Sequence, residues 1–211
     1  VPQLARRDDP SLPNPHAPAG PILTVSPEEI ARFFVRVRRE EDAEGWDVRL
    51  DAALREILER ANDFVPSESG GILLDDPRSK LAGVRTPRLT FIAVYGPESA
   101  ERLGRRIPSD HGFVGQIYRT GAPARTDKLD PHDPLMPFAA ARPNGRPPVE
   151  SIIGVPVIVG ESICGVLQLM NRRSGGPYSA RDSELLRIFA AYMSSSIQNA
   201  LDAIRARALS R

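Results

Sequence analysis

Few side chains in this sequence could carry covalent or redox chemistry. Cys164 is the single cysteine, which rules out an internal disulfide, a Cys-x-x-Cys redox pair and a multi-cysteine zinc site. It lies beside Gly165 in an apolar run, where a small buried side chain is favoured over a reactive thiol. No nucleophile and general base stand at a recognisable spacing. We therefore expect that the protein is not an enzyme and that it resides in the reducing cytoplasm.

Metal ligands are also sparse. The chain has three histidines, which are His16, His111 and His132; their separation offers no paired zinc ligands. His111 precedes Gly112 and could ligate a haem iron or contact an anion, but a helix-capping or solvated histidine is favoured. Three aspartates share one segment without the central glycine and final glutamate of a calcium loop, namely Asp127, Asp130 and Asp133. The sequence therefore predicts no metal site and disfavours haem.

The overall composition narrows the range of partners. Lys and Arg number 28 against 27 for Asp and Glu, so no broad positive field exists to collect nucleic-acid phosphates. Hydrophobic residues make up 41% and charged residues 26%, which suffices for a packed interior. Apolar runs such as 152–159 are far shorter than the roughly 20 residues of a membrane helix, and no signal peptide opens the chain. We expect one folded domain with neither a nucleic-acid partner nor a membrane association.

Residues 1–45 are expected to precede the main domain. Prolines recur from Pro2 to Pro21, which makes residues 1–25 an arm or linker. Ser26-Pro27-Glu28-Glu29 is typical of a helix start, and apolar residues follow at helical spacing, so we expect an N-terminal helix over 26–45. A second amphipathic helix is indicated from Trp46 to Ala61.

The rest of the chain predicts a sheet with helices around it. Strands are indicated over 71–74 and 89–95. On the second of these, alternation places four side chains on one face: Leu89, Phe91, Ala93 and Tyr95. A short helix over 112–118 ends near Gly121, and a long irregular loop spans 123–148. Residues 151–159 and 163–171 predict a hairpin in which Pro156 marks an edge or bulge, and a long helix from about Ser179 completes an α+β order.

Four segments, in this order, resemble the GAF domain family. They are Gly112-Phe113-Val114-Gly115-Gln116-Ile117, Thr120-Gly121-Ala122-Pro123, Ser151 to Val157, and Ile163 to Asn171. The resemblance covers residues 46–205 and leaves 206–211 as a tail. It implies a central antiparallel sheet with a layer of N-terminal and C-terminal helices on one face. On the other face it implies loops and short helices over a ligand pocket, which is a GAF/PAS-like arrangement.

The resemblance also implies where a small molecule would bind. The candidate ligand-binding residues are Phe91, Phe113, Ile117, Asp127, Met136, Phe138, Arg142 and Ser151. For Phe91, Phe113 and Ile117 an ordinary core role is the alternative, and for Asp127 and Arg142 the alternative is solvated loop charge. The identity of the molecule stays open.

Known activities of the family set further expectations. Members that bind cyclic nucleotides carry Asn-Lys, Phe and Asp-Glu after the last hairpin, where this chain has Asn171-Arg172, Tyr178 and Asp182-Ser183. With three of the five positions altered, a cyclic nucleotide is possible but not indicated. Arg172 and Asp182 are instead expected to form a structural ion pair. Methionine sulfoxide reduction needs several cysteines, and a bilin thioether needs one in a pocket loop, so Cys164 suits neither.

Two functions remain open at this stage. The first is a signal-transduction sensor that binds a small molecule and relays occupancy through terminal helices and dimerisation. The second is a ligand-free dimerisation or protein-docking scaffold. We expect the first turns of the last helix to cover the sheet through Leu185, Ile188, Phe189, Tyr192 and Met193. Past these turns we expect a homodimer interface at Ile197, Leu201 and Ile204, unless the first two helices cover those side chains within one chain.

Overall fold

The computed structural model describes residues 20–26, 28–30, 50–75, 87–136 and 149–209. Its strands form one antiparallel sheet in the order β1-β3-β2-β7-β6-β5, with β4 paired to β3. The strands are β1 Leu23–Thr24, β2 Ser67–Asp75, β3 Arg88–Tyr95, β4 Arg106–Pro108, β5 Ala124–Thr126, β6 Ile152–Val159 and β7 Ser162–Arg172. The helices are α2 Leu50–Phe64, α4 Ser99–Arg102, α5 Gly112–Thr120 and α6 Ala180–Leu209.

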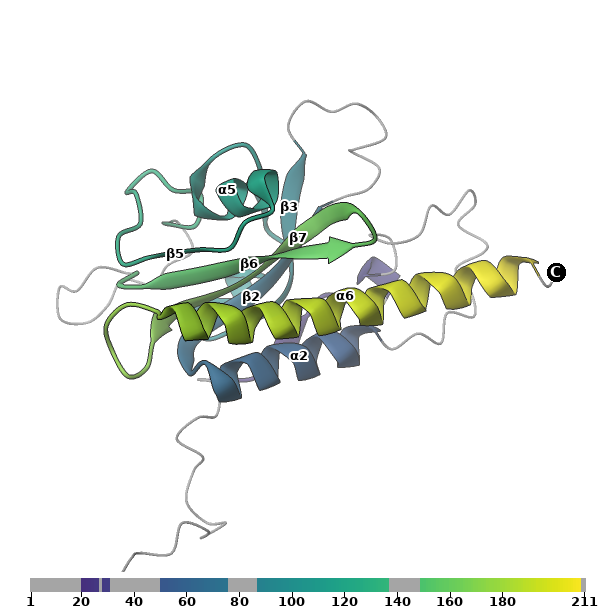
Figure 1. Cartoon of the computed structure of the whole chain (residues 1–211), viewed down its shortest axis with the longest axis horizontal. Helices are drawn as coiled ribbons and strands as arrows, with labels where there is room; N and C mark the ends of the chain where they lie inside the picture. The colour runs from purple at the N-terminus through teal and green to yellow at the C-terminus, as the bar shows by residue number, and fades with distance from the viewer. Residues whose placement is uncertain (1–19, 27, 31–49, 76–86, 137–148, 210–211) are drawn as a thin grey trace, which may run out of the picture.

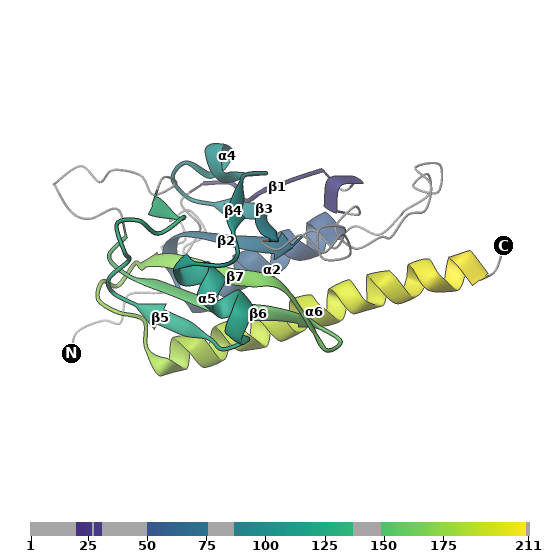
Figure 2. The ribbon, with the colours of Figure 1, turned by 90° about the horizontal axis from the view of Figure 1, so that it is seen from above.

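Helices cover the two faces of the sheet unequally. Helices α2 and α6 lie side by side on one face, and the short helix α5 lies on the other, as Figure 1 and Figure 2 show. This arrangement confirms the predicted α+β fold with a central antiparallel sheet and a helical layer on one face. None of the helices within the described ranges is both long and apolar enough to cross a bilayer.

The apolar core is divided by the sheet into two clusters. The α2/α6 cluster contains the buried stripe of α2, which is Leu50, Leu54, Ile57, Leu58 and Ala61, together with side chains of β2, β3, β6, β7 and α6. The α5 cluster contains Leu73, Leu89, Phe91, Val94, Ile107, Phe113, Val114, Ile117, Tyr118, Leu135, Val149, Ile152, Val166 and Met170. Each cluster buries one face of the same strands, so every central strand is apolar on both sides.

The N-terminal region differs in part from the expected arm and helix. Leu23 and Thr24 pair with Val94 and Ala93 of β3, so the end of the predicted arm is an edge strand. The predicted helix start is present, because Ser26 and Glu29 form a reciprocal cap in which each backbone N–H donates to the other side chain. Residues 28–30 are helical, and the rest of the expected 26–45 helix lies outside the described residues.

Strand β3 does not keep the strict alternation that the sequence predicts. Ile72 of β2 pairs with Ala93, whereas the next residue of β2 pairs with Phe91, so Ile92 is an extra residue and forms a β-bulge. As a result, Phe91 belongs to the α5 cluster, while Ala93 and Tyr95 belong to the α2/α6 cluster. The prediction that these three side chains share a face is therefore wrong, because one inserted residue reverses the side on which later side chains lie.

Helix α6 covers the sheet with only part of the face expected for it, since Met193 is buried and Leu185 and Phe189 are half-buried against the α2/α6 cluster. Its buried side chains are Asp182, Leu186, Ala190, Met193 and Ile197. Ile188 and Tyr192, which were expected to cover the sheet, are 63% and 56% exposed. Ile197 is fully buried within its own chain, so the prediction that it forms a dimer interface is wrong. The side chains of Leu201 and Ile204 lie outside the described residues.

Candidate functional site

A row of three residues crosses the centre of the sheet on its α5 face. Gln168 of β7 pairs with Gly71 of β2 on one side and with Gly154 of β6 on the other. Paired residues of antiparallel strands project from the same face. A methyl group on Gly154 would meet Ile117 Cδ1 at 2.6 Å, and one on Gly71 would meet Phe91 Cδ1 at 3.3 Å. The two glycines therefore let Ile117 of α5 and Phe91 of β3 pack closely against the backbone on either side of Gln168.

The amide of Gln168 is the unusual feature of this row. The residue is fully buried, and within the described structure neither its Oε1 nor its Nε2 has a hydrogen-bond partner. Leaving a buried polar group unpaired costs about 1–3 kcal/mol, because the group has lost its hydrogen bonds to water. An amide with both of its polar atoms unpaired is chemically complementary to a molecule that can donate and accept hydrogen bonds.

Apolar side chains surround the amide row. Phe91, Phe113 and Ile117, which the sequence nominated as ligand contacts, are all buried in the α5 cluster. Leu135 and Val149, which flank the undescribed part of the long loop, belong to the same cluster. Three of the nominated residues therefore do lie together, over the face that carries Gln168.

A buried aspartate anchors α5 and the loop that follows β5. Asp133 accepts hydrogen bonds from Phe113 N at 2.6 Å and from Leu135 N at 2.9 Å. The first of these satisfies an amide at the start of α5, where the helix dipole also favours a negative charge. At the other end of α5, Gly121 adopts a φ of 65° and returns its N–H to Ile117 O, as the sequence predicts. Asp133 therefore joins the start of α5 to the loop that follows β5.

A second polar contact ties α5 to the sheet. The hydroxyl of Tyr118 donates a hydrogen bond to Asp75 Oδ2 at the end of β2, and both residues are buried. Burial, and then the hydrogen bond to Asp75, raise the pKa of Tyr118. The phenol therefore stays protonated at neutral pH and holds the C-terminal half of α5 against the sheet.

The remaining nominated residues are placed less favourably for a ligand. Asp127 is exposed and Met136 is half-buried, while Phe138 and Arg142 lie outside the described residues. Ser151 is buried, but its backbone oxygen and Oγ accept hydrogen bonds from the N–H groups of Asn171 and Arg172. Ser151 therefore closes the base of the β6–β7 hairpin.

The expected ion pair is present at the exit of the hairpin. Arg172 Nε lies 3.4 Å from Asp182 Oδ2. The same carboxylate caps α6 by accepting hydrogen bonds from Ser179 N and Ser179 Oγ at 2.7 and 2.9 Å. The pair thus fixes the start of α6 relative to β7, which is a structural function.

Gln168 was missed as a candidate because the sequence nominated aromatic and loop residues. The available signal was one polar residue inside the apolar run from Val166 to Met170. Strand alternation alone could have placed it on the face of Val166 and Met170. Its lack of a partner could be recognised only from the packing. Among the described residues, no cluster of three or more His, Cys, Asp or Glu side chains is arranged to hold a metal ion.

Comparison with known proteins supports this architecture. The family model described as GAF domain matches residues 47–198. The GAF-B domain of DevS from Mycobacterium smegmatis is 20% identical, with a TM-score of 0.56 over 74% of this chain and 98% of that chain. The PixJ GAF domain of Thermosynechococcus elongatus, in its blue-light absorbing form, is 13% identical, with a TM-score of 0.56 over 75% of this chain and 90% of that one.

A third solved structure, the GAF domain/HD domain protein from Geobacter sulfurreducens, is 12% identical and has a TM-score of 0.53 over 72% of this chain and 94% of that one. At these identities the solved structures show a shared fold. The family model adds the sequence pattern over most of the chain. We conclude that the chain belongs to the GAF domain family.

Proposed function

We propose that this GAF domain is a non-catalytic sensory module of a cytoplasmic signalling protein, and that it binds one small molecule on the α5 face of its sheet. The observation that carries the proposal is the buried Gln168 amide, whose two polar atoms lack partners in the described structure. A ligand that supplies both a donor and an acceptor would remove the cost of leaving them unpaired.

The surroundings of Gln168 define the chemistry of the ligand. Phe91, Phe113 and Ile117 supply apolar and aromatic surface, which favours a flat, largely apolar molecule. One edge of that molecule must donate and accept hydrogen bonds, as a heterocyclic amide or a carboxamide does. Because Ile117 lies close over Gly154, the ligand must displace α5 outward as it binds.

Strand β7 offers a direct route from the ligand to the output helices. Gln168 lies on the α5 face, whereas its neighbours Leu167 and Leu169 belong to the α2/α6 cluster. Helix α6 packs on the same cluster through Leu186, Met193 and Ile197. A shift of β7 on ligand binding would therefore change the packing beneath α6.

Ligand capture tests the proposal. Native mass spectrometry of freshly purified protein should show a bound metabolite on the wild type. It should also show that metabolite on Gln116→Met, a control at an exposed position of α5. We expect Gln168→Met, which keeps the length of the side chain and removes the amide, to purify without it. Equal loading of Gln168→Met would contradict the proposed site.

If the protein retains no metabolite, a thermal-shift screen with nucleobases, aromatic acids and aromatic amides takes the place of mass spectrometry. A compound that binds only the folded state raises the stability of the protein. Failure of every probe to stabilise the wild type more than Gln168→Met would favour the scaffold function instead.

Dimerisation is the second element of the proposed relay. Ile188 and Tyr192 lie one helical turn apart on α6 and are 63% and 56% exposed, so they offer an apolar contact to a second copy of the chain. Light scattering should show a dimer that Ile188→Glu weakens and that Gln116→Glu, on α5, leaves unchanged. A wild type that is monomeric at tens of micromolar, or a dimer indifferent to Ile188→Glu, would refute this interface.

A further inference from the structure

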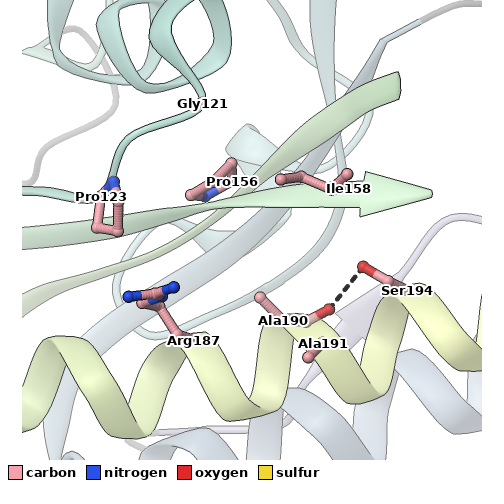
Figure 3. A pocket seen from close by; sticks show the side chains of 8 residues that line it. All are labelled: Gly121, Pro123, Pro156, Ile158, Arg187, Ala190, Ala191 and Ser194. Atoms are coloured by element: carbon pink, nitrogen blue, oxygen red, sulfur yellow. Dashed lines mark hydrogen bonds between the residues drawn. The ribbon is translucent and has the colours of Figure 1, made fainter. Parts of the chain in front are cut away.

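A groove of about 290 Å³ lies at the edge of the sheet, between β6 and α6. One wall is formed by Pro123, Pro156 and Ile158, and the other by Arg187, Ala190 and Ala191 of the helix (Figure 3). Its volume is just below the range for small-molecule pockets, which begins at about 300 Å³.

The local sequence explains why this groove is open. Strand β5 pairs with β6 only as far as Gly154, so Pro156 and Ile158 lie beyond the reach of that neighbour. Ala190 and Ala191 are the smallest side chains that keep a helix stable, and they leave the space between helix and strand unfilled. Pro156 has no backbone N–H, so it adds a hydrocarbon surface without a donor.

Two of the residues lining the groove have polar side chains, and one of these two is charged. The Ser194 hydroxyl at its far end donates to Ala190 O at 2.8 Å and is already satisfied. Arg187 carries the only formal charge among the lining residues that the structure describes, and its side chain reaches toward Pro123 (Figure 3). Within the described part of the chain it forms an ion pair with Glu184 Oε1 at 3.6 Å, in which both side chains are exposed. Exposed ion pairs of this kind contribute little to stability, so the guanidinium keeps N–H donors for a ligand.

We propose that this groove binds a small monocarboxylate with an apolar body. The guanidinium of Arg187 holds the carboxylate, for which its planar donors are suited, and the body lies along Pro123, Pro156 and Ala191. This site is separate from the Gln168 site, because none of its lining residues belongs to the α5 cluster around Gln168. Its occupant touches both β6 and α6 and would therefore act directly on the output helix.

A titration with 4-phenylbutyrate and with its uncharged analogue 4-phenylbutyramide tests the proposal on the full chain. Isothermal titration or NMR shift changes should show that the wild type binds the carboxylate more tightly than the amide. Arg187→Gln should lower the affinity for the carboxylate about five- to tenfold and leave the affinity for the amide unchanged. Arg181→Gln is the matched control, since Arg181 is an exposed arginine of the same helix outside the groove.

A second variant distinguishes binding in the groove from binding to the surface charge of Arg187 alone. Ala191→Leu fills the groove from an exposed helix position and should abolish binding of both probes without loss of folding. The proposal is overturned if the wild type binds neither probe. It is overturned as well if Arg181→Gln lowers the affinity for the carboxylate as much as Arg187→Gln does, or if Ala191→Leu binds both probes as tightly as the wild type. It is also overturned if Gln168→Met abolishes carboxylate binding, because the probe would then occupy the α5 face.

Discussion

Replacing Gln168 by methionine should stabilise the ligand-free protein. Methionine resembles glutamine in length and flexibility and lacks the amide. In the described structure, both polar atoms of that amide are buried without partners. Substitutions inside a core normally destabilise, so a gain in stability would identify a polar group that is kept for a purpose other than folding.

The size of the gain follows from the cost of the unpaired amide. One unsatisfied buried polar group costs about 1–3 kcal/mol, and the lost packing precision of methionine offsets part of this. We expect a net gain in the free energy of unfolding of about 2 kcal/mol. For a protein of this length, about 2–4 °C in Tm corresponds to each kcal/mol, so Tm should rise by about 4–8 °C.

The assay is urea denaturation followed by circular dichroism, with calorimetry for Tm. Gln116→Met is the matched control, because Gln116 is exposed on α5; its stability should change by less than about 0.5 kcal/mol. A loss of stability in Gln168→Met, or a change no larger than that of the control, would show that the amide is satisfied in the folded protein. The argument for a ligand at this position would then fail.

Two further predictions concern structural contacts. Burial raises the pKa of the Tyr178 hydroxyl, which donates to Ser67 Oγ. Its stabilisation is therefore complete below the unfolded pKa of about 10 and is lost as the pH rises further. The midpoint of urea unfolding should thus fall less steeply above about pH 10 in Tyr178→Phe than in the wild type. Tyr192→Phe, at an exposed position, is the control and should behave as the wild type does. Identical pH dependence of the midpoint in Tyr178→Phe and the wild type would disprove this. Asp182→Ala removes the α6 cap and the Arg172 contact, and it should lower the free energy of unfolding by about 1–2 kcal/mol. A loss no larger than that of Glu184→Ala, at an exposed position of the same helix, would contradict this prediction.

Much of the secondary structure could be predicted from local patterns. The apolar stripe of α2, the glycine that ends α5 and the two runs of the β6–β7 hairpin each follow from neighbours within one or two turns of chain. Pro156 was expected at an edge or bulge, and it lies beyond the end of β5 with a register shift one residue later, between Val157 and Ile158. The Arg172–Asp182 pair followed from the family resemblance.

The errors occur where several segments compete for one position. Both possible faces of α6 are apolar, and only the placement of α2 and β6 decides that Ile197 is buried while Ile188 and Tyr192 are exposed. A bulge at Ile92 likewise depends on how β2 and β3 pair. Helical period shows that a stripe exists, but it cannot choose between two stripes of similar hydrophobicity.

The sequence by itself determined the element order, the fold class and the family, because these depend on the spacing of residue types along the chain. Only the tertiary structure showed that Gln168 lies between Gly71 and Gly154 without a hydrogen-bond partner. It also placed Arg187 over an apolar groove formed with Pro123 and Pro156. The physical reason is that a polar group is satisfied or unsatisfied according to what surrounds it in space, and those neighbours come from strands and helices far apart in the sequence.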